Sequence, residues 1–123
     1  MNVKNKIFYF FVGLMTISCA GPYTEKDNGS TIELSEDDPF EVKLEGEANS
    51  DFSWRLVSKN ENIEMQGAPT LTVSGANNEY TFNFIAKGYG DDLVRLDYSN
   101  GTKIEKTYEL RVIVGTMGRI TSE

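Results

Sequence analysis

The sequence contains no histidine and a single cysteine, Cys19, among its 123 residues. Without histidine the chain cannot build the Ser-His or Cys-His pairs that activate a nucleophile. One cysteine cannot complete the usual zinc ligand sets, and it cannot form a disulfide within the chain. We therefore expect no enzymatic activity, no metal and no cofactor, and a fold that is held together by apolar packing.

Carboxylates are the remaining groups with acid–base chemistry, and they cluster at Glu36-Asp37-Asp38 and at Asp91-Asp92. Both clusters lie among polar residues that predict turns, with no apolar neighbours to raise a carboxyl pKa. We interpret them as solvated turns. Weak calcium binding is the alternative, although neither cluster has a regular ligand spacing.

Basic residues are also scarce, with 12 against 19 acidic residues and a formal net charge of −7. Removal of residues 1–18 takes away Lys4 and Lys6, which leaves ten basic residues and a net charge of −9. An acidic surface of this kind repels nucleic acids and anionic membranes. We therefore expect no nucleic-acid partner.

The apolar run from Ile7 to Ile17 is too short to span a bilayer comfortably, because a spanning helix needs roughly 20 residues. A basic start precedes it and Ser18-Cys19 follows it, an order typical of a signal peptide. Cys19 lies where bacterial lipoproteins are cleaved and lipidated, although Thr16 replaces the usual aliphatic residue. We predict a lipid anchor on Cys19 in the bacterial cell envelope; a chance cysteine near an ordinary cleavage site is the alternative.

The remaining 105 residues suffice for one domain with one core. Residues 19–30 are polar, with Gly and Pro but no periodicity, and predict a flexible spacer that carries the lipid. The domain is expected to occupy residues 31–115, followed by a polar tail at 116–123. The division of the chain is thus a signal peptide at 1–18, a spacer, one domain and a tail.

Within the domain, short runs alternate between apolar and polar residues, as half-buried strands do. Turn residues such as Asp38-Pro39, Gly88 and Asn100-Gly101 separate them. The predicted strands are 31–34, 40–44, 52–57, 62–65, 70–73, 80–86, 93–98 and 103–114. Seven or eight strands in this length predict an all-β, immunoglobulin-like antiparallel β-sandwich without a disulfide.

The order of segments resembles the chagasin-like inhibitors of papain-like cysteine peptidases. The family's first loop, Asn-Pro-Thr-Thr-Gly before Phe-x-Trp, corresponds to residues 47–51 before Phe52-Ser53-Trp54. Its Gly-x-Gly-Gly loop, followed by alternating aromatics, corresponds to residues 75–78 before 80–86. Its Leu-x-Tyr strand corresponds to Leu96-Asp97-Tyr98, although the Arg-Pro-Trp loop that follows in the family is Ser99-Asn100-Gly101-Thr102 in this chain.

The resemblance implies an immunoglobulin-like fold and an inhibitor that blocks the active-site cleft of a cysteine peptidase with three loops. With the lipid predicted on Cys19, the inhibitor would be lipid-anchored, and we expect it to be a monomer. It assigns the inhibitory role to Ala48, Asn49, Ser50, Asp51, Gly75, Ala76, Asn77, Asn78, Ser99, Asn100 and Gly101. Since the aromatic anchor of the third loop is absent, the resemblance implies a different target or weaker inhibition. The alternative function is an envelope lipoprotein whose immunoglobulin-like module binds a partner protein, or a glycan through exposed aromatics such as Tyr89.

Overall fold

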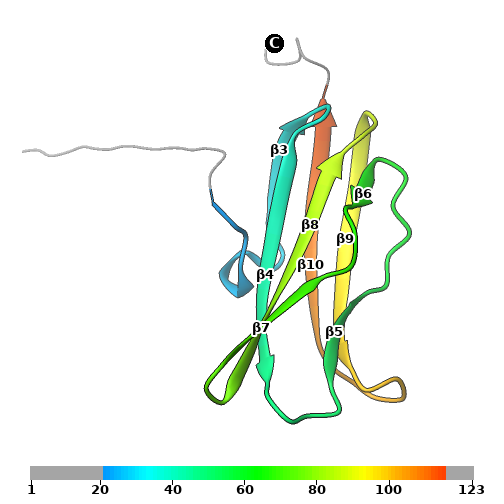
Figure 1. The fold of residues 1–123 in the computed structure, drawn as a ribbon. Coiled ribbons are helices and arrows are strands. Elements are labelled where there is room, and N and C mark those ends of the chain that lie inside the picture. Colours follow the sequence, from blue (N-terminus) through cyan, green and yellow to red (C-terminus); the bar gives the residue numbers. More distant parts are fainter. Residues whose placement is uncertain (1–20, 116–123) are drawn as a thin grey trace, which may run out of the picture.

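The computed structural model describes residues 21–115, and almost all of this backbone is extended (Figure 1). The predicted signal peptide, Cys19 and the tail at 116–123 lie outside the described residues. All eight predicted strands are present, with ends that differ by a few residues from the prediction. A short 3₁₀ helix at Glu25–Asp27 precedes the strands β3 Thr31–Ser35, β4 Pro39–Glu47, β5 Ser53–Leu56, β6 Ile63–Met65, β7 Thr70–Ser74, β8 Asn77–Ala86, β9 Gly90–Ser99 and β10 Ile104–Gly115.

The strands form two sheets that pack face to face, which confirms the predicted sandwich (Figure 1). One sheet has the order β3-β10-β9-β5, and the other has the order β4-β8-β6, with β7 also pairing with β8. The strand pairs are antiparallel except for β3 with β10, which is parallel. Parallel neighbours need a long connection, and here the intervening strands supply it.

The core consists of apolar side chains at every second position of the strands, as the alternation in the sequence predicts. The apolar side chains on this parity in β4, β8 and β9, and in β10 from Tyr108 onward, are less than 9% exposed, and Trp54 of β5 is 4% exposed. Phe52 and Leu56, on the same parity as Trp54, are only partly buried and pack against the margin of the core. The buried set is Phe40, Val42, Leu44, Trp54, Ile63, Tyr80, Phe82, Phe84, Ala86, Val94, Leu96, Tyr98, Tyr108, Leu110, Val112 and Val114.

Residues 21–30, which we call the strap, fall in the predicted flexible spacer but are bonded to both sheets. Tyr23 pairs with β4 through Tyr23 N to Glu41 O at 2.9 Å and Lys43 N to Tyr23 O at 2.8 Å. Gly29 N then donates to Glu109 O of β10 at 2.7 Å. The strap thus crosses from the edge of one sheet to the other sheet, and hydrogen bonds to the sheets begin before Thr31.

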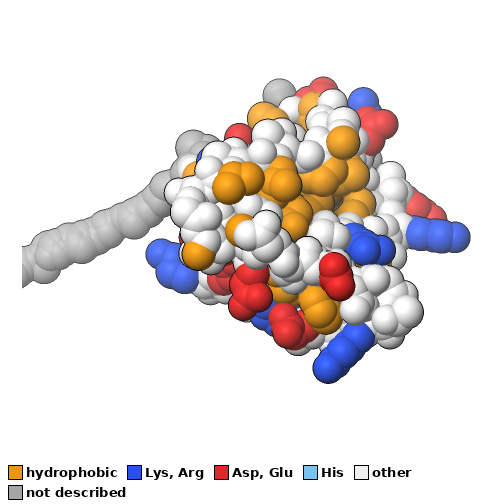
Figure 2. Space-filling view, turned by 60° about the horizontal axis from the view of Figure 1, so that its bottom comes forward, with side chains coloured by type: hydrophobic (Ala, Val, Ile, Leu, Met, Phe, Trp, Pro, Cys, Tyr) orange, Lys and Arg blue, Asp and Glu red, His pale blue; other side chains and the backbone are white. Residues whose placement is uncertain are grey.

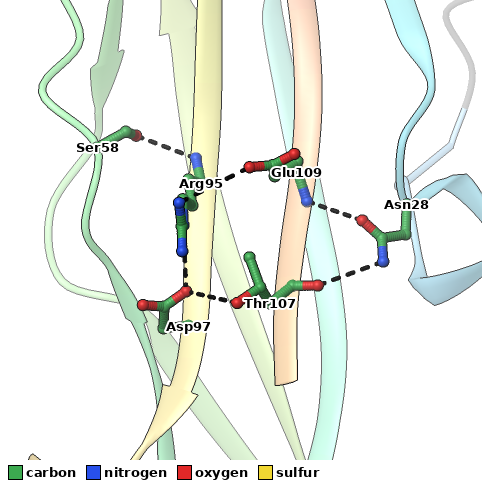
Figure 3. A network of polar contacts seen from close by, with 6 residues as sticks. All are labelled: Asn28, Ser58, Arg95, Asp97, Thr107 and Glu109. Carbon is green, nitrogen blue, oxygen red and sulfur yellow. Dashed lines mark hydrogen bonds and ion pairs between the residues drawn. The ribbon is translucent and has the colours of Figure 1, made fainter. Parts of the chain in front are cut away.

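Asn28 completes this crossing with its side chain (Figure 3). Its Oδ1 accepts a hydrogen bond from Glu109 N at 2.8 Å, and its Nδ2 donates to Thr107 O at 3.3 Å. A primary amide carries one acceptor and a donor group, as a peptide unit does. Asn28 therefore extends the ladder between β3 and β10 beyond the first residue of β3.

The outer face of β9 and β10 carries a second set of polar contacts around Asp97 (Figure 3). Asp97 is only 5% exposed, and its Oδ1 accepts from Thr107 Oγ1 at 3.0 Å and from Arg95 Nε at 3.4 Å. Arg95 also lies 3.9 Å from a carboxylate oxygen of Glu109. These contacts neutralise a buried carboxylate and tie two strands together, which is a structural role.

The acidic clusters differ from the prediction of solvated turns in one respect. Asp91 and Asp92 lie within β9, and Asp92 accepts hydrogen bonds from Asn60 Nδ2 at 2.7 Å and Asn62 N at 2.9 Å. Asp92 therefore holds the connection between β5 and β6 against β9. The turn at Glu36–Asp38 is present, and Asp38 accepts from Ser35 N at 2.9 Å.

Among residues 21–115, no group of three or more His, Cys, Asp or Glu side chains is arranged so that it could hold a metal ion. Over the same residues, no helix is both long enough and apolar enough to cross a bilayer.

Candidate functional site

Three connections meet at one end of the sandwich, at the bottom of Figure 1. They join β4 to β5, β7 to β8, and β9 to β10, and we call them together the loop end. Strand register brings them close, because Glu47 is paired with Asn77 and Ser53 with Ser99. The first two connections are joined directly by Ala48 N, which donates to Ala76 O at 2.9 Å.

The residues assigned from the resemblance all lie at or beside this end. Ala48, Asn49, Ser50 and Asp51 occupy the first connection, Gly75 and Ala76 form the second, and Asn100 and Gly101 lie in the third. Asn77 and Asn78 are the first residues of β8, and Ser99 is the last of β9, so these residues belong to strand ends rather than loops.

Backbone conformation at the loop end depends on left-handed residues in each connection. Gly75 has φ 65°, and it is the first central residue of a two-residue hairpin turn. Gly101 has φ 99° in the third connection. In the first connection the left-handed residue is Asn49, with φ 60°; asparagine adopts this conformation more readily than most residues. Asn77 and Asn78 do not have positive φ and belong to β8.

Short polar side chains hold the first and third connections in shape. Ser50 Oγ accepts from Phe52 N at 3.0 Å, and Ser99 Oγ accepts from Gly101 N at 2.9 Å. Asn100 Oδ1 accepts from Thr102 N at 3.0 Å and from Lys103 N at 2.8 Å. Such side-chain bonds to nearby backbone groups define turns locally. The connections are therefore preorganised without help from a partner.

Two buried aromatic residues support the loop end from beneath. Trp54 Nε1 donates to Glu45 O at 3.0 Å, and the Tyr98 hydroxyl accepts from Glu47 N at 2.9 Å. Their ring centroids lie 5.2 Å apart, and Lys106 Nζ lies 4.9 Å from the Tyr98 ring centroid. The alternation predicts both rings as core residues. The alternation does not indicate that the Trp54 indole nitrogen and the Tyr98 hydroxyl hold the last residues of β4, which lead into the first connection.

The hydroxyl of Tyr108 differs from that of Tyr98, because it is buried without a hydrogen-bond partner among the described residues. Burial, aided by the negative charges of Asp27 and Glu25, raises the pKa of Tyr108 above its ordinary value of 10.0. The unfolded chain therefore releases this phenolic proton first as the pH rises. The contribution of Tyr108 to stability is present below pH 10 and is lost above it.

Replacing Tyr108 with phenylalanine is expected to leave stability at pH 7 unchanged or to raise it by up to about 1 kcal/mol, because no hydrogen bond is lost. Tyr98→Phe should lower the free energy of unfolding by about 1 kcal/mol, since Glu47 N loses its acceptor. Urea unfolding at pH 7 and pH 10.5 measures both effects, and Tyr108→Phe should lose less stability on going to the higher pH. A larger cost for Tyr108→Phe than for Tyr98→Phe at pH 7 would contradict this assignment.

A group of hydrophobic side chains is exposed on the side of the molecule that adjoins the loop end, and Figure 2 shows a continuous patch there. Leu71 and Val73 of β7 are 50% and 67% exposed, and Val57, just after β5, is 47% exposed. The other residues of the loop end offer small and polar side chains, and Phe52, the last residue of the first connection, is partly buried against Tyr98. No exposed aromatic anchor is present among the described loop-end residues.

No protein-family model matches the sequence, and no curated protein matches it. Solved structures do resemble the fold. The cysteine protease inhibitor EhICP2 from Entamoeba histolytica matches with a TM-score of 0.66 and 14% identity, over 77% of this chain and 94% of that chain. Amebosin matches with a TM-score of 0.57 and 24% identity, over 77% of this chain and 100% of that chain.

A third structure, PbICP-C in complex with falcipain-2, matches with a TM-score of 0.51 and 13% identity, over 79% of this chain and 90% of that chain. At these identities the likeness concerns the fold. The domain therefore has the chagasin-like fold that the order of its segments predicts.

Proposed function

We propose that the chain is an inhibitor of cysteine peptidases that blocks the active-site cleft with its loop end. The observation that carries this proposal is the gathering of three preorganised connections at one end of a chagasin-like sandwich. EhICP2, a cysteine protease inhibitor, shares this fold. The absence of histidine removes the commonest general base and excludes the His-dependent catalytic pairs.

The loop end suits a narrow cleft, because three residues of its first two connections are small. Ala48, Ala76 and Gly75 have little or no side chain, and Ala48 N to Ala76 O holds the first two connections together. A rigid, left-handed backbone at Gly75 and Asn49 would not adopt the extended shape that a peptidase needs to cut a substrate. Preorganised loops also lose little conformational entropy on binding, which saves about 0.5–1.5 kcal/mol for each side chain already ordered.

Affinity is expected to be moderate, since the loop end lacks an exposed aromatic side chain. Buried aromatic anchors typically account for about 2–4 kcal/mol of such interfaces. The absence of such an anchor corresponds to roughly 30-fold to 1,000-fold weaker binding. We therefore expect inhibition in the micromolar range unless the target cleft has features that fit these small side chains.

We also propose that lipid on Cys19 anchors the inhibitor in a bacterial cell envelope. The sequence pattern around Cys19 supports this. Tyr23 forms a parallel bridge with Val42 of β4, so Gly21 and Pro22, which precede it, lead toward the start of β4 and away from the loop end. An anchor on that side would leave the loop end free to meet a peptidase.

The test is to titrate residues 20–123 against papain and a secreted bacterial cysteine peptidase, with Gly75→Val and Asn49→Val as loop variants. Both variants are expected to raise the inhibition constant at least tenfold, because a β-branched residue is strained at positive φ. Gly67→Val is the matched control, since Gly67 also has positive φ (75°) and open space around it but lies between β6 and β7.

Gly67→Val should lose comparable stability while keeping wild-type inhibition. Equal loss of inhibition in Gly67→Val and Gly75→Val would mean that the effect arises from stability and not from the loop end. Failure of the wild-type domain to inhibit either enzyme at tens of micromolar would rule out the proposed function.

The second candidate function is a binding module, and Tyr89 is the observation that favours it. Tyr89 is 55% exposed at the end opposite the loop end, and its hydroxyl donates to Glu36 Oε1 at 2.9 Å. An exposed ring held in one orientation can stack on a sugar or on a partner side chain. Retention of a glycan or partner protein that is lost in Tyr89→Ala, without inhibition by the wild type, would favour this function.

A further inference from the structure

Strand β7 is an edge strand whose outer side has no partner. It pairs only with β8, and all five of its residues are exposed. Alternate residues of an antiparallel ladder direct their N–H and C=O groups to opposite sides. In a hairpin closed by Ser74 and Asn77, the outward groups belong to Leu71 and Val73. By contrast, the outer side of β4 is bonded to the strap.

The segment around β7 is also free of charge. Residues 65–78 contain no Asp, Glu, Lys or Arg, in a chain where these make up 25% of the residues. Edge strands normally carry charges that prevent pairing with another chain. The other edge strands do so, since β3 contains Glu33 and β5 contains Arg55. β7 lacks this protection.

The side chains of β7 match this open edge. Leu71 lies opposite the buried Tyr80 in the ladder, so Leu71 and Val73 face the core side of the sheet. They nevertheless remain half exposed or more, because no strand beyond β7 covers them. The hydrophobic patch in Figure 2 lies on the side of the molecule that carries this open edge. Backbone groups and apolar side chains are thus available together.

We propose that β7 pairs with β7 of a second copy of this chain, antiparallel and around a two-fold axis at Thr72. This register places Leu71 beside the second copy's Val73 and joins their outward N–H and C=O groups. Aliphatic cross-strand pairs of this kind favour association. The choice of a second copy follows from shape and charge. The two-fold register pairs β7 with itself, and residues 20–123 carry a net charge of −9, so two copies repel over most of their surface but not along the uncharged residues 65–78.

The association is expected to be weak. A five-residue strand contact falls below the roughly 1,200–2,000 Å² that a stable interface buries. We expect a dissociation constant of about 0.1–1 mM. The chain is then monomeric at micromolar concentration, as expected from the sequence, and it dimerises when concentrated. This inference does not depend on inhibition of a peptidase.

Sedimentation equilibrium of residues 20–123 between 10 µM and 1 mM tests the proposal. The average mass should rise from one chain toward two, and Val73→Lys should keep the mass at one chain by placing charge in the contact. Ile104→Lys is the matched control, because Ile104 is 54% exposed and lies on β10. It should associate as the wild type does.

Several outcomes would overturn the proposal. They are a mass of one chain for the wild type at 1 mM, an undiminished association in Val73→Lys, and an equal loss in both lysine variants, which would indicate unspecific hydrophobic contact. Weaker peptidase inhibition by Val73→Lys, combined with an unchanged mass for the wild type at all concentrations, would assign β7 to the peptidase instead.

Discussion

Replacing Gly46 with alanine is expected to lower the free energy of unfolding by about 2–3 kcal/mol. Gly46 lies in β4, and a Cβ at this position would meet Tyr98 Cε1 at 2.8 Å, the Tyr98 hydroxyl at 3.0 Å and Tyr80 Cε1 at 3.1 Å. Both rings are buried, with exposures of 2% and 8%, and cannot move aside freely. The added methyl must therefore displace Tyr98 or the end of β4.

The same substitution should disturb the position of the first connection and so reduce the proposed inhibition. Tyr98 holds Glu47 N, and Glu47 directly precedes Ala48 of the first connection. Movement of the ring would break this hydrogen bond, so we expect a several-fold loss of the inhibition proposed above in addition to the loss of stability. Urea unfolding measures stability, and titration against the peptidase measures the second effect.

The control for Gly46→Ala is Gly21→Ala, where no atom lies within 4 Å of the added methyl. It should leave stability within about 0.5 kcal/mol of the wild type. Gly46→Ala should also cost less in a Tyr98→Leu background, because the smaller side chain makes room for the methyl. An unchanged urea midpoint for Gly46→Ala would show that Tyr98 is not held as the structure has it.

The strands could be predicted from the sequence because alternation with period two reports burial directly. The apolar parity of Phe82-x-Phe84 and Leu110-x-Val112 is the buried parity in the structure. β7 shows the limit of that signal. Leu71 and Val73 have the alternation of a half-buried strand, but burial also requires a neighbour, and the sequence does not say that no strand lies beyond them.

The loop end could be located from the order of the segments, but its support could not. Hydrogen bonds from Trp54 Nε1 and to the Tyr98 hydroxyl depend on how two strands of different sheets approach each other. Asp92 illustrates the same limit, because adjacent acidic residues have the composition of a turn. Its two partners, Asn60 and Asn62, come from a connection some thirty residues earlier in the chain.

The strap was the least predictable element. Its composition is that of a flexible spacer, with Gly21, Pro22 and Gly29 and no apolar periodicity. What fixes it is a small number of specific contacts. Tyr23 packs against Phe40 with ring centroids 6.2 Å apart, Glu25 Oε2 accepts from Glu45 N at 2.6 Å, and Asn28 bonds to β10 through both ends of its amide. Composition does not report contacts of this kind.

A chain that begins at Ser30 is therefore expected to be less stable than residues 20–123 by about 3 kcal/mol. Burial of an aromatic side chain contributes about 1.5–3 kcal/mol, and each intramolecular hydrogen bond contributes about 0.5–1.5 kcal/mol. Part of the lost free energy is recovered, because the backbone groups of β4 and β10 that lose their partners in the strap become hydrated. Asn28→Ala alone should cost about 1–2 kcal/mol, because it removes both amide contacts with β10.

Urea unfolding of these variants at pH 7 makes the measurement, with Lys26→Ala as the matched control, because Lys26 lies within the strap and is exposed. Lys26→Ala should unfold as the wild type does. If the chain beginning at Ser30 is as stable as residues 20–123, the strap is a spacer after all. A clear loss confined to the deletion and to Asn28→Ala would make the strap part of the domain, and only Ala20 would then separate it from the proposed lipid on Cys19.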